Sequence, residues 1–457
     1  MAKFSANTPR RVAVIGAGWA GCAAAVELAR HGISVSLIEA SRNLGGRARG
    51  VSVNGLELDN GQHILLGAYS SCLQLMRKLD IDTGTALLKL PLQMVYPDNE
   101  DGMRFIAPRL PAPLHLLFAL WTAKGLQRGD KMALARFSTT ARWMGWQLHQ
   151  DCSVSELLER FEQTPRLCRL MWHPLCIAAL NTPPERASAQ VFLNVLRDSL
   201  GARRAASDML LPRTDLSAIL PARAAAFVTQ HGGQTLLASA VSSLHHTENG
   251  QWQLNTRQNA SVDTAPPLYD GVIIATDVAT AERLLQTLAS PPPSLPDYSY
   301  EAITTCYLQY AATVRLRRAM LALLDDAGQK KWGQYVFDRG QLHQDQAGLL
   351  AVVISASNQA CELAQEELAK DVASQLAESL QMPELAKPLW HKCISEKRAT
   401  FSCTPGLVRP ENRTDLPGLY LAGDYTKGDY PATLEGAVRS GIAASQCVLA
   451  GFKQTSK

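Results

Sequence analysis

The sequence predicts an α/β fold in which a Rossmann-like nucleotide-binding domain is discontinuous and carries an inserted α+β domain. A strand, a glycine-rich turn and a helix open the chain within residues 11–30. A hydrophobic run (VIIA) at 272–275 is typical of a strand in the middle of a sheet. A short strand at 418–421 then leads into a helix over 433–449. These elements complete one domain only if the intervening sequence forms something else.

The first strand–turn–helix unit has the pattern of a dinucleotide site. Residues 16–21 read G-A-G-W-A-G, and Glu39 ends the next strand, expected at 33–38. The first glycine permits the tight turn, the second lets the backbone approach a pyrophosphate, and the third allows close helix packing. The helix N-terminus attracts the phosphate charge, and Glu39 would accept hydrogen bonds from the adenosine ribose. The residues predicted to bind here are Gly16, Gly18, Trp19, Ala20, Gly21, Glu39 and Ala40.

A second glycine-rich element follows at residues 44–49 (L-G-G-R-A-R). Gly45 and Gly46 expose backbone N–H groups where a large cofactor lies against the chain, and Arg47 can neutralise its diphosphate. This element resembles the G-G-R element of the amine oxidase and phytoene desaturase superfamily of flavoproteins, and an exposed basic turn is its alternative interpretation.

The third element lies near the other end of the chain, at residues 419–424 (L-Y-L-A-G-D) and 433–441. In the same superfamily such an aspartate binds the ribityl chain, and the following helix points its N-terminal amides at the flavin. The resemblance therefore assigns Gly423 and Asp424 to the ribityl chain, and Thr433 and Leu434 to the ring. It also assigns Val241, which follows a Gly-Gly-Gln turn, to adenine, although an ordinary hairpin explains that turn as well. Together these elements predict FAD, held non-covalently in a glutathione-reductase-like arrangement.

The remaining sequence divides between this domain and two insertions. We assign residues 1–91, 206–290 and 401–457 to the FAD-binding domain. Residues 92–205 have helical periodicity and many Leu and Trp, and predict a helical lobe facing substrate or membrane. Residues 291–400 predict the sheet and helix of a substrate domain, introduced by a proline-rich connection. The strands expected in residues 206–290 are 235–244 and 251–256, and those expected in residues 291–400 are 304–310, 333–337 and 349–355, followed by a helix at 361–380.

Three internal segments narrow the resemblance. They are residues 59–69 (DNGQHILLGAY), 181–190 (NTPPERASAQ) and 431–436 (PATLEG). These segments resemble the hydroxysqualene dehydroxylases, the squalene-associated FAD-dependent desaturases of bacterial hopanoid biosynthesis, and the similarity spans essentially the whole chain. It implies an isoprenoid lipid substrate, hydroxysqualene, whose hydroxyl is replaced by hydrogen to give squalene, and an external electron donor that reduces the FAD.

Other functions of the same superfamily stay open. A phytoene-type carotenoid desaturase, a flavin amine oxidase and a non-catalytic FAD-binding scaffold for squalene synthesis would all need the same cofactor elements. Amine oxidases usually carry an aromatic residue two positions before the glutamate of the last helix, where this chain has Thr433. That departure disfavours an amine substrate, although Tyr425, Tyr430 or Trp332 could supply an aromatic wall.

Removal of an allylic hydroxyl by hydride delivery also needs a proton for the leaving oxygen. His63 lies in a segment that passes beside the flavin in the relatives, which makes it the first candidate acid. A structural histidine bonded to backbone is an equally good interpretation. Asp429 and Tyr430, just before the last helix, are the other candidates.

Composition excludes several classes of function. A net charge of +4 over 457 residues, with the charges interspersed, gives no support for nucleic-acid binding. Ten cysteines without paired metal spacing, in a chain that begins without a signal peptide, predict free thiols, no metal site and a cytoplasmic location. No apolar run is long enough to span a bilayer, but residues 114–121 (LHLLFALW) could lie on one. We therefore expect peripheral contact with the inner face of the membrane, with a helix of the inner core as the alternative.

Overall fold

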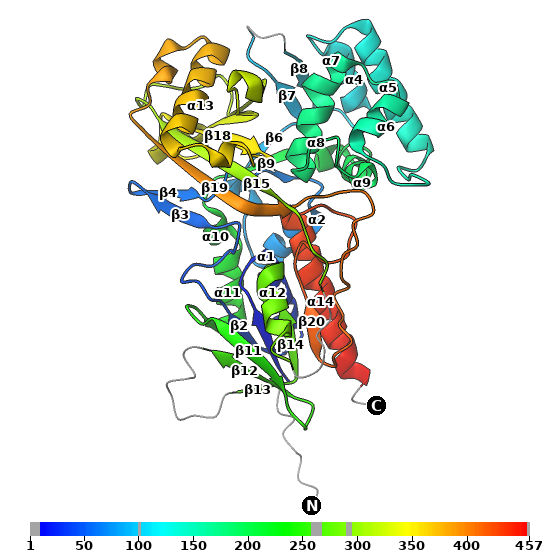
Figure 1. The fold of residues 1–457 in the computed structure, drawn as a ribbon, viewed down its shortest axis with the longest axis vertical. Coiled ribbons are helices and arrows are strands. Elements are labelled where there is room, and N and C mark those ends of the chain that lie inside the picture. The colour runs from blue at the N-terminus through cyan, green and yellow to red at the C-terminus, as the bar shows by residue number, and fades with distance from the viewer. Residues whose placement is uncertain (1–9, 99–101, 257–266, 289–294, 455–457) are drawn as a thin grey trace, which may run out of the picture.

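The computed structural model describes residues 10–98, 102–256, 267–288 and 295–454 (Figure 1). Most of the proline-rich connection expected after the second part of the nucleotide-binding domain lies outside these residues. The described chain forms a lower nucleotide-binding part and, above it, a sheet covered by α13 that lies beside a helical lobe (Figure 1).

The nucleotide-binding part is built on a five-stranded parallel sheet. Segments from three distant regions of the chain supply its strands, which confirms a discontinuous Rossmann-like domain. In spatial order they are β10 (Gln234–Leu236), β2 (Ser34–Ile38), β1 (Arg11–Ile15), β14 (Gly271–Ile274) and β20 (Leu419–Leu421).

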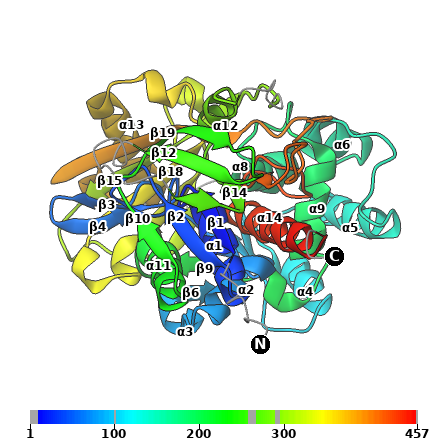
Figure 2. The ribbon, with the colours of Figure 1, turned by 90° about the horizontal axis from the view of Figure 1, so that it is seen from below.

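The parallel sheet is covered on both faces because its strands are apolar on both sides. Val12 and Val14 of β1 pack toward three helices, whereas Ala13 and Ile15 pack toward a second, three-stranded sheet and one helix. Figure 2 shows the two coverings on opposite sides of β1 and β14. The first covering comprises α1 (Trp19–Arg30), α11 (Pro221–Gln230) and α14 (Leu434–Gln454), and the second comprises β11 (Val241–His246), β12 (Trp252–Thr256), β13 (Leu268–Tyr269) and α12 (Val278–Leu285).

Small residues bring α1 and α14 close together. A Cβ atom at Gly441 of α14 would lie 2.1 Å from the carbonyl oxygen of Ala20 in α1. Gly21 of α1 packs as closely on the turn before the helix, since a Cβ atom there would lie 1.9 Å from the carbonyl oxygen of Gly16. Neither position accepts a larger residue without moving backbone. The third glycine of the N-terminal motif therefore has the packing role that the sequence predicts.

One predicted strand is wrong in its extent. The segment 235–244 was expected to form a single strand, but it forms β10 and β11, which belong to different sheets. Ala238, between them, has a left-handed φ of 51°, which turns the chain out of the parallel sheet.

The second large sheet is antiparallel, and its order is β16-β17-β18-β15-β19. The three strands predicted in this region are confirmed, and α13 (Gln365–Leu380) begins four residues later than the helix expected from 361. Cys306, Val336 and Val352 point under α13, and Tyr307, Phe337 and Val353 point to the opposite face. The strands are β15 (Tyr300–Gln309), β16 (Met320–Ala322), β17 (Tyr335–Asp338), β18 (Leu349–Ser355) and β19 (Trp390–Phe401).

The helical lobe occupies the upper right of Figure 1. Three aromatic rings form its centre: the ring centroid of Trp172 lies 4.6 Å from that of Phe137 and 6.2 Å from that of Phe192. A short hairpin of β7 (Gln93–Val95) and β8 (Arg104–Ile106), which helical periodicity did not predict, opens the lobe. Its main helices are α4 (Leu114–Thr122), α5 (Arg128–Trp143), α6 (Val154–Arg160), α8 (His173–Leu180) and α9 (Ala189–Ser199).

Short elements join these parts. The pair β3–β4 and the three-stranded sheet β5-β9-β6 lie between the nucleotide-binding part and the upper parts (Figure 1). The bounds are β3 (Gly50–Val53), β4 (Leu56–Asp59), β5 (Leu65–Leu66), β6 (Leu87–Leu90), β9 (Met209–Pro212), α2 (Ser70–Lys78), α3 (Thr83–Ala86), α7 (Pro165–Leu167) and α10 (Leu216–Ile219).

Candidate functional site

A cavity of about 870 Å³ connects the N-terminal end of α1 with the second large sheet and with helices α4 and α5. Gly21 does not line it, because this residue faces the glycine turn. Asp429 does not line it either, and its side chain is exposed. The predicted residues that do line it are Gly16, Gly18, Trp19, Ala20, Glu39, Ala40, Gly45, Gly46, Arg47, Val241, Gly423, Asp424, Thr433 and Leu434, together with His63 and Tyr430.

The two glycine-rich loops lie against each other at one end of the cavity. Gly18 and Gly45 form a β-bridge, and a Cβ atom at Gly46 would lie 3.2 Å from the Cα atom of Gly18. No side chain caps the N-terminus of α1 at Gly18, and the first turn contains no acidic residue. The positive end of the helix is therefore available to an anionic group in the cavity.

Glu39 shapes this end of the cavity as well as lining it. Its carboxylate accepts hydrogen bonds from the backbone N–H groups of Ala17 at 2.7 Å and Ser41 at 2.8 Å. Trp19, at the first position of α1, is buried, and its indole Nε1–H makes no hydrogen bond within the described part of the chain. A buried donor without a partner is costly, so this N–H indicates a place for an acceptor on a bound group.

The first and last parts of the chain meet at an ion pair. The Arg47 guanidinium lies 2.6 Å from an Asp424 carboxylate oxygen and also donates to the backbone carbonyl of Ala399 at 2.8 Å. The carboxylate of Asp424 raises the pKa of Arg47, since it stabilises the guanidinium charge. The predicted role of Arg47 at a diphosphate stays a prediction, and in this structure its charge is matched by the predicted ribityl ligand.

Thr433 begins α14 by capping it. Its hydroxyl accepts a hydrogen bond from the backbone N–H of Gly436 at 3.1 Å, and its carbonyl accepts one from Ala437 at 2.9 Å. The residue that replaces an amine-oxidase aromatic therefore has a local structural reason to be Thr. Thr433 and Leu434 both line the cavity that the glycine-rich loops line, so the N-terminus of α14 lies at its wall.

His63 presents one ring nitrogen to the cavity. The Nδ1–H group donates to the backbone carbonyl of Gly61 at 2.6 Å, which leaves Nε2 to exchange a proton with a bound molecule. Burial lowers the pKa of His63, and the Gly61 carbonyl opposes that shift only partly. Both interpretations of this histidine are thus compatible with the geometry: it bonds to backbone and it faces the cavity.

The loop that carries His63 is held from two sides. Asn60 donates to the carbonyl of Arg47 at 2.8 Å, which ties the loop to the glycine-rich element. Gln62 accepts a hydrogen bond from Arg339 at 2.7 Å, and Arg339 is almost completely buried. Sequence reasoning missed the Gln62–Arg339 contact, because the two residues are far apart in the chain and Arg339 belongs to no segment that the sequence singled out.

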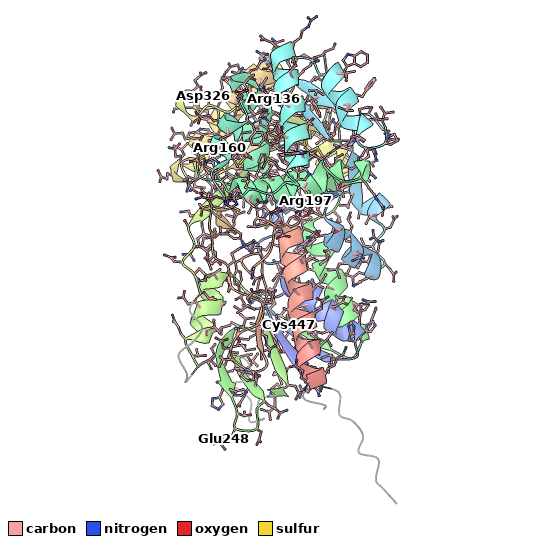
Figure 3. All side chains as sticks on the ribbon, turned by 90° about the vertical axis from the view of Figure 1, so that its right-hand side faces the viewer. Arg136, Arg160, Arg197, Glu248, Asp326 and Cys447 are labelled. Atoms are coloured by element: carbon pink, nitrogen blue, oxygen red, sulfur yellow. The ribbon has the colours of Figure 1, made fainter. Side chains whose placement is uncertain are left out.

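Tyr430 is a poor proton donor in this setting. Its hydroxyl donates to an Asp198 carboxylate oxygen at 2.6 Å, and the Arg439 guanidinium carbon lies 4.3 Å from its ring centroid. Burial and the hydrogen bond to Asp198 raise the pKa of Tyr430. Asp198 also pairs with Arg197 at 2.7 Å, just above the start of α14 in Figure 3.

The other end of the cavity is apolar. Tyr335, Phe337 and Val353 lie on one face of the second large sheet, and Met171 and Trp172 come from the helical lobe. Within the described residues the Tyr335 hydroxyl contacts one acceptor, the thioether sulfur of Met94 at 3.7 Å, which is a weak partner. This phenol is therefore a polar group with spare hydrogen-bonding capacity in an apolar chamber. In the described ranges no three His, Cys, Asp or Glu side chains converge in a way that could hold a metal ion.

An open helix N-terminus beside two glycine-rich loops, on a parallel sheet backed by a three-stranded sheet, defines the class of dinucleotide-binding flavoproteins. The sequence places the chain within that class. Residues 19–449 match the family model described as flavin containing amine oxidoreductase. The chain belongs to this family, and its cofactor is a flavin.

Individual relatives cover nearly the whole chain. The hydroxysqualene dehydroxylase of Rhodopseudomonas palustris is 29% identical over 454 residues, covering 96% of this chain and 99% of the relative. The probable zeta-carotene desaturase of Synechococcus elongatus is 24% identical over 480 residues, covering 96% and 98%. The crystal structure of a putative protoporphyrinogen oxidase from Exiguobacterium sp. 255-15 has the same fold, with a TM-score of 0.68 at 16% identity over 97% of this chain and 99% of that one.

Proposed function

We propose that the protein is an FAD-dependent oxidoreductase that removes the hydroxyl group of hydroxysqualene to give squalene. The observation that carries the proposal is that one continuous cavity has glycine-rich loops at one end and an apolar chamber at the other. The full-length similarity to hydroxysqualene dehydroxylases supports this substrate class. A protein with that activity takes part in squalene and hopanoid biosynthesis.

The residues at the polar end fit non-covalently bound FAD. The open N-terminus of α1 would receive the pyrophosphate, Glu39 the adenosine ribose and Val241 the adenine. Asp424 would accept hydrogen bonds from the ribityl chain, and the N-terminus of α14 would face the ring. The unpartnered indole N–H of Trp19 supports a bound group with acceptor oxygens at this place.

The proposed reaction replaces hydroxyl by hydrogen: the alcohol, one proton and one hydride give the hydrocarbon and one water. Reduced FAD would supply the hydride, and an external donor would restore its two electrons after each turnover. The chain's part is to place the proton donor and exclude water from the carbon. Among the candidates, His63 lines the cavity and its Nε2 has no hydrogen-bond partner in the described residues, Tyr430 donates to Asp198, and Asp429 does not line the cavity. We therefore assign the proton to His63.

An apolar C30 substrate is expected to reach the protein from a membrane. We propose that residues 114–121, now seen as most of α4, contact one leaflet from the cytoplasmic side. Leu114, Leu117, Phe118 and Trp121 are exposed, which supports a surface position over an inner-core helix. None of the helices in the described ranges combines the length and apolarity needed to cross a bilayer.

A carotenoid desaturase is the second candidate, because a zeta-carotene desaturase and a probable zeta-carotene desaturase are 24% identical to this chain over 96% of its length. Such an enzyme would oxidise its substrate and reduce the flavin, whereas the proposed enzyme does the reverse. An amine oxidase would need an aromatic wall where Thr433 caps α14. A non-catalytic scaffold would hold FAD without redox change during squalene synthesis.

The deciding experiment reduces the holoenzyme anaerobically in D2O, so that the exchangeable flavin N5 position carries deuterium, and incubates it with hydroxysqualene in the same solvent. We expect squalene with one deuterium at the carbon that carried the hydroxyl, identified by mass spectrometry. Desaturation of phytoene or squalene by the oxidised enzyme would replace the proposal with the carotenoid alternative. Absence of any flavin redox change with these substrates and with amines would favour the scaffold.

A further inference from the structure

The exposed apolar side chains of the protein gather on two helices. Ten large hydrophobic side chains in the described residues are exposed, and six of them belong to α4 and α5. Trp121 is 73% exposed, Met132 73% and Trp143 86%, which are large fractions for residues of this kind. Figure 1 places both helices at the end of the molecule farthest from the N-terminus, and Figure 3 marks α5 there by Arg136.

On each helix the apolar residues form a stripe. Leu114, Leu117, Phe118 and Trp121 stand at i, i+3, i+4 and i+7 of α4, so they share its outward face. Met132 and Trp143 are about three turns apart on α5 and therefore also share one face. The Phe118 and Trp121 rings are in edge contact, with centroids 5.6 Å apart. We name the exposed residues of these two stripes the docking surface.

The charge around the docking surface is strongly positive. Residues 107–150 contain six Arg and Lys but one acidic residue, Asp130. Asp130 is buried and occupied locally, since it accepts hydrogen bonds from Gln127 and Thr164 at the start of α5. Arg109, Lys124, Arg128 and Arg142 are exposed and form no ion pair with any residue that the structure describes. Unpaired cations beside exposed Trp and Leu complement a surface that is apolar inside and anionic outside.

The cavity reaches the same place. Its lining includes Leu116, Leu117 and Leu120 of α4 and Leu134 and Arg142 of α5. Leu117 both lines the cavity and is 56% exposed, so it marks the mouth between the two helices. The opening that an apolar substrate would use therefore borders the docking surface at Leu117.

We propose that α4 and α5 together dock on an anionic phospholipid leaflet, with the cavity mouth opening directly into its acyl layer. This inference deepens the proposed function and rests on it for the identity of the substrate. It adds a second helix to the contact, assigns the lipid charge, and makes docking and substrate entry one event. A substrate dissolved in the leaflet would then reach the apolar chamber without crossing water.

The test is co-sedimentation of the holoenzyme with vesicles of phosphatidylcholine alone and of phosphatidylcholine with 30% phosphatidylglycerol. We expect binding to the anionic vesicles that falls with added salt. The double variant Trp121→Asp/Trp143→Asp should lose at least about tenfold in binding. The variant Lys124→Gln/Arg128→Gln should lose about 20-fold on anionic vesicles and little on neutral ones. Controls are Leu389→Asp and Val408→Asp, since both residues are 74% exposed and belong to neither helix.

Two results would overturn the inference. One is unchanged binding of the tryptophan variant to anionic vesicles. The other is a wild-type dimer that the same variant converts to monomer by analytical ultracentrifugation, which would make the docking surface an interface between two copies. Turnover with detergent-solubilised hydroxysqualene keeps the two proposals apart. Lost vesicle binding with normal turnover in detergent supports both, whereas absent turnover in the wild type removes the proposed function and leaves the docking surface standing.

Discussion

Asp59 is a buried carboxyl group whose ionisation should destabilise the protein at and above neutral pH. Its side chain is fully buried, one oxygen accepts the backbone N–H of Leu216 at 2.7 Å, and the other has no partner in the described part of the chain. Burial raises its pKa to about 7, and the Leu216 N–H and the positive charge of Arg339 offset only part of that effect. The pKa of Asp59 is higher in the folded chain than in the unfolded chain. The stability that the protonated carboxyl group contributes is therefore complete at low pH and is lost as pH rises through 7.

The size of the effect follows from the shift. The rise in the pKa of Asp59 from 3.8 to about 7 corresponds to about 4 kcal/mol in the free energy of unfolding. About 3 kcal/mol of this is lost between about pH 4.5 and 8. An unfolding entropy of about 2.1 cal/mol/K per residue makes 1 kcal/mol equivalent to about 1 °C in a chain of 457 residues. Asp59→Asn cannot ionise. Its Tm relative to wild type should therefore rise by about 3 °C over that pH range.

Differential scanning fluorimetry of both proteins at half-unit steps of pH measures this difference. The exposed Asp98→Asn is the control, and its Tm difference from wild type should stay constant, because the Asp98 side chain is 76% exposed. Parallel Tm curves for wild type and Asp59→Asn would refute the argument, since they would mean that Asp59 has the same pKa in the folded and unfolded chains.

Three further predictions test the residues around the cavity. Glu435→Gln should lower Tm by about 2–3 °C, because this buried carboxylate accepts hydrogen bonds from the first N–H groups of α2 and pairs with an arginine. The control is the exposed Glu411→Gln, which should change Tm by less than about 1 °C in the same assay. His63→Ala should retain flavin but slow dehydroxylation about 10²–10⁴-fold. The wild-type rate should fall as pH rises through a pKa below 6.5, and a flat stopped-flow profile would exclude this histidine as the acid. Asp424→Ala and Glu39→Ala should each weaken FAD binding by about 1–3 kcal/mol, and full occupancy of the double variant by absorbance would show that the cofactor lies elsewhere.

Features that depend on neighbours in sequence were predictable. The turn at Gly16, the close packing at Gly21 and the second strand that leads to Glu39 follow from glycine spacing within one βαβ unit, whereas the contact of Gly18 with Gly46 is seen only in the structure. The separated return of β14 and β20 to the same sheet was also predictable, because both are short and apolar on both faces.

Features that depend on distant pairing were not predictable. Alternation identified the strand that contains Tyr335, but which of its faces meets the cavity depends on the register of β17 with β18. Glu435 belongs to a segment that the sequence singled out, yet its partners lie at the start of α2, a helix for which no prediction was made. The break at Ala238 was missed because an alanine in a left-handed conformation has no sequence signal of the kind glycine provides.

The loop from Asp59 to His63 shows how the two ends of the cavity are coordinated. Asn60 donates to the carbonyl of Arg47, and Arg47 in turn pairs with Asp424. The start of the loop is therefore bonded to the glycine-rich element and, through it, to the segment that carries Asp424. Gln62 fixes it to Arg339, which follows β17 of the sheet that floors the apolar chamber. His63 lies at the point where these two constraints meet. If His63 is the proton donor that we propose, these two hydrogen bonds fix its loop relative to both ends of the cavity. Arg339 is buried near Asp59, and its side-chain partners among the described residues are the amides of Gln62 and Gln346, so the loop that carries His63 is joined to the sheet of the chamber through a buried charge.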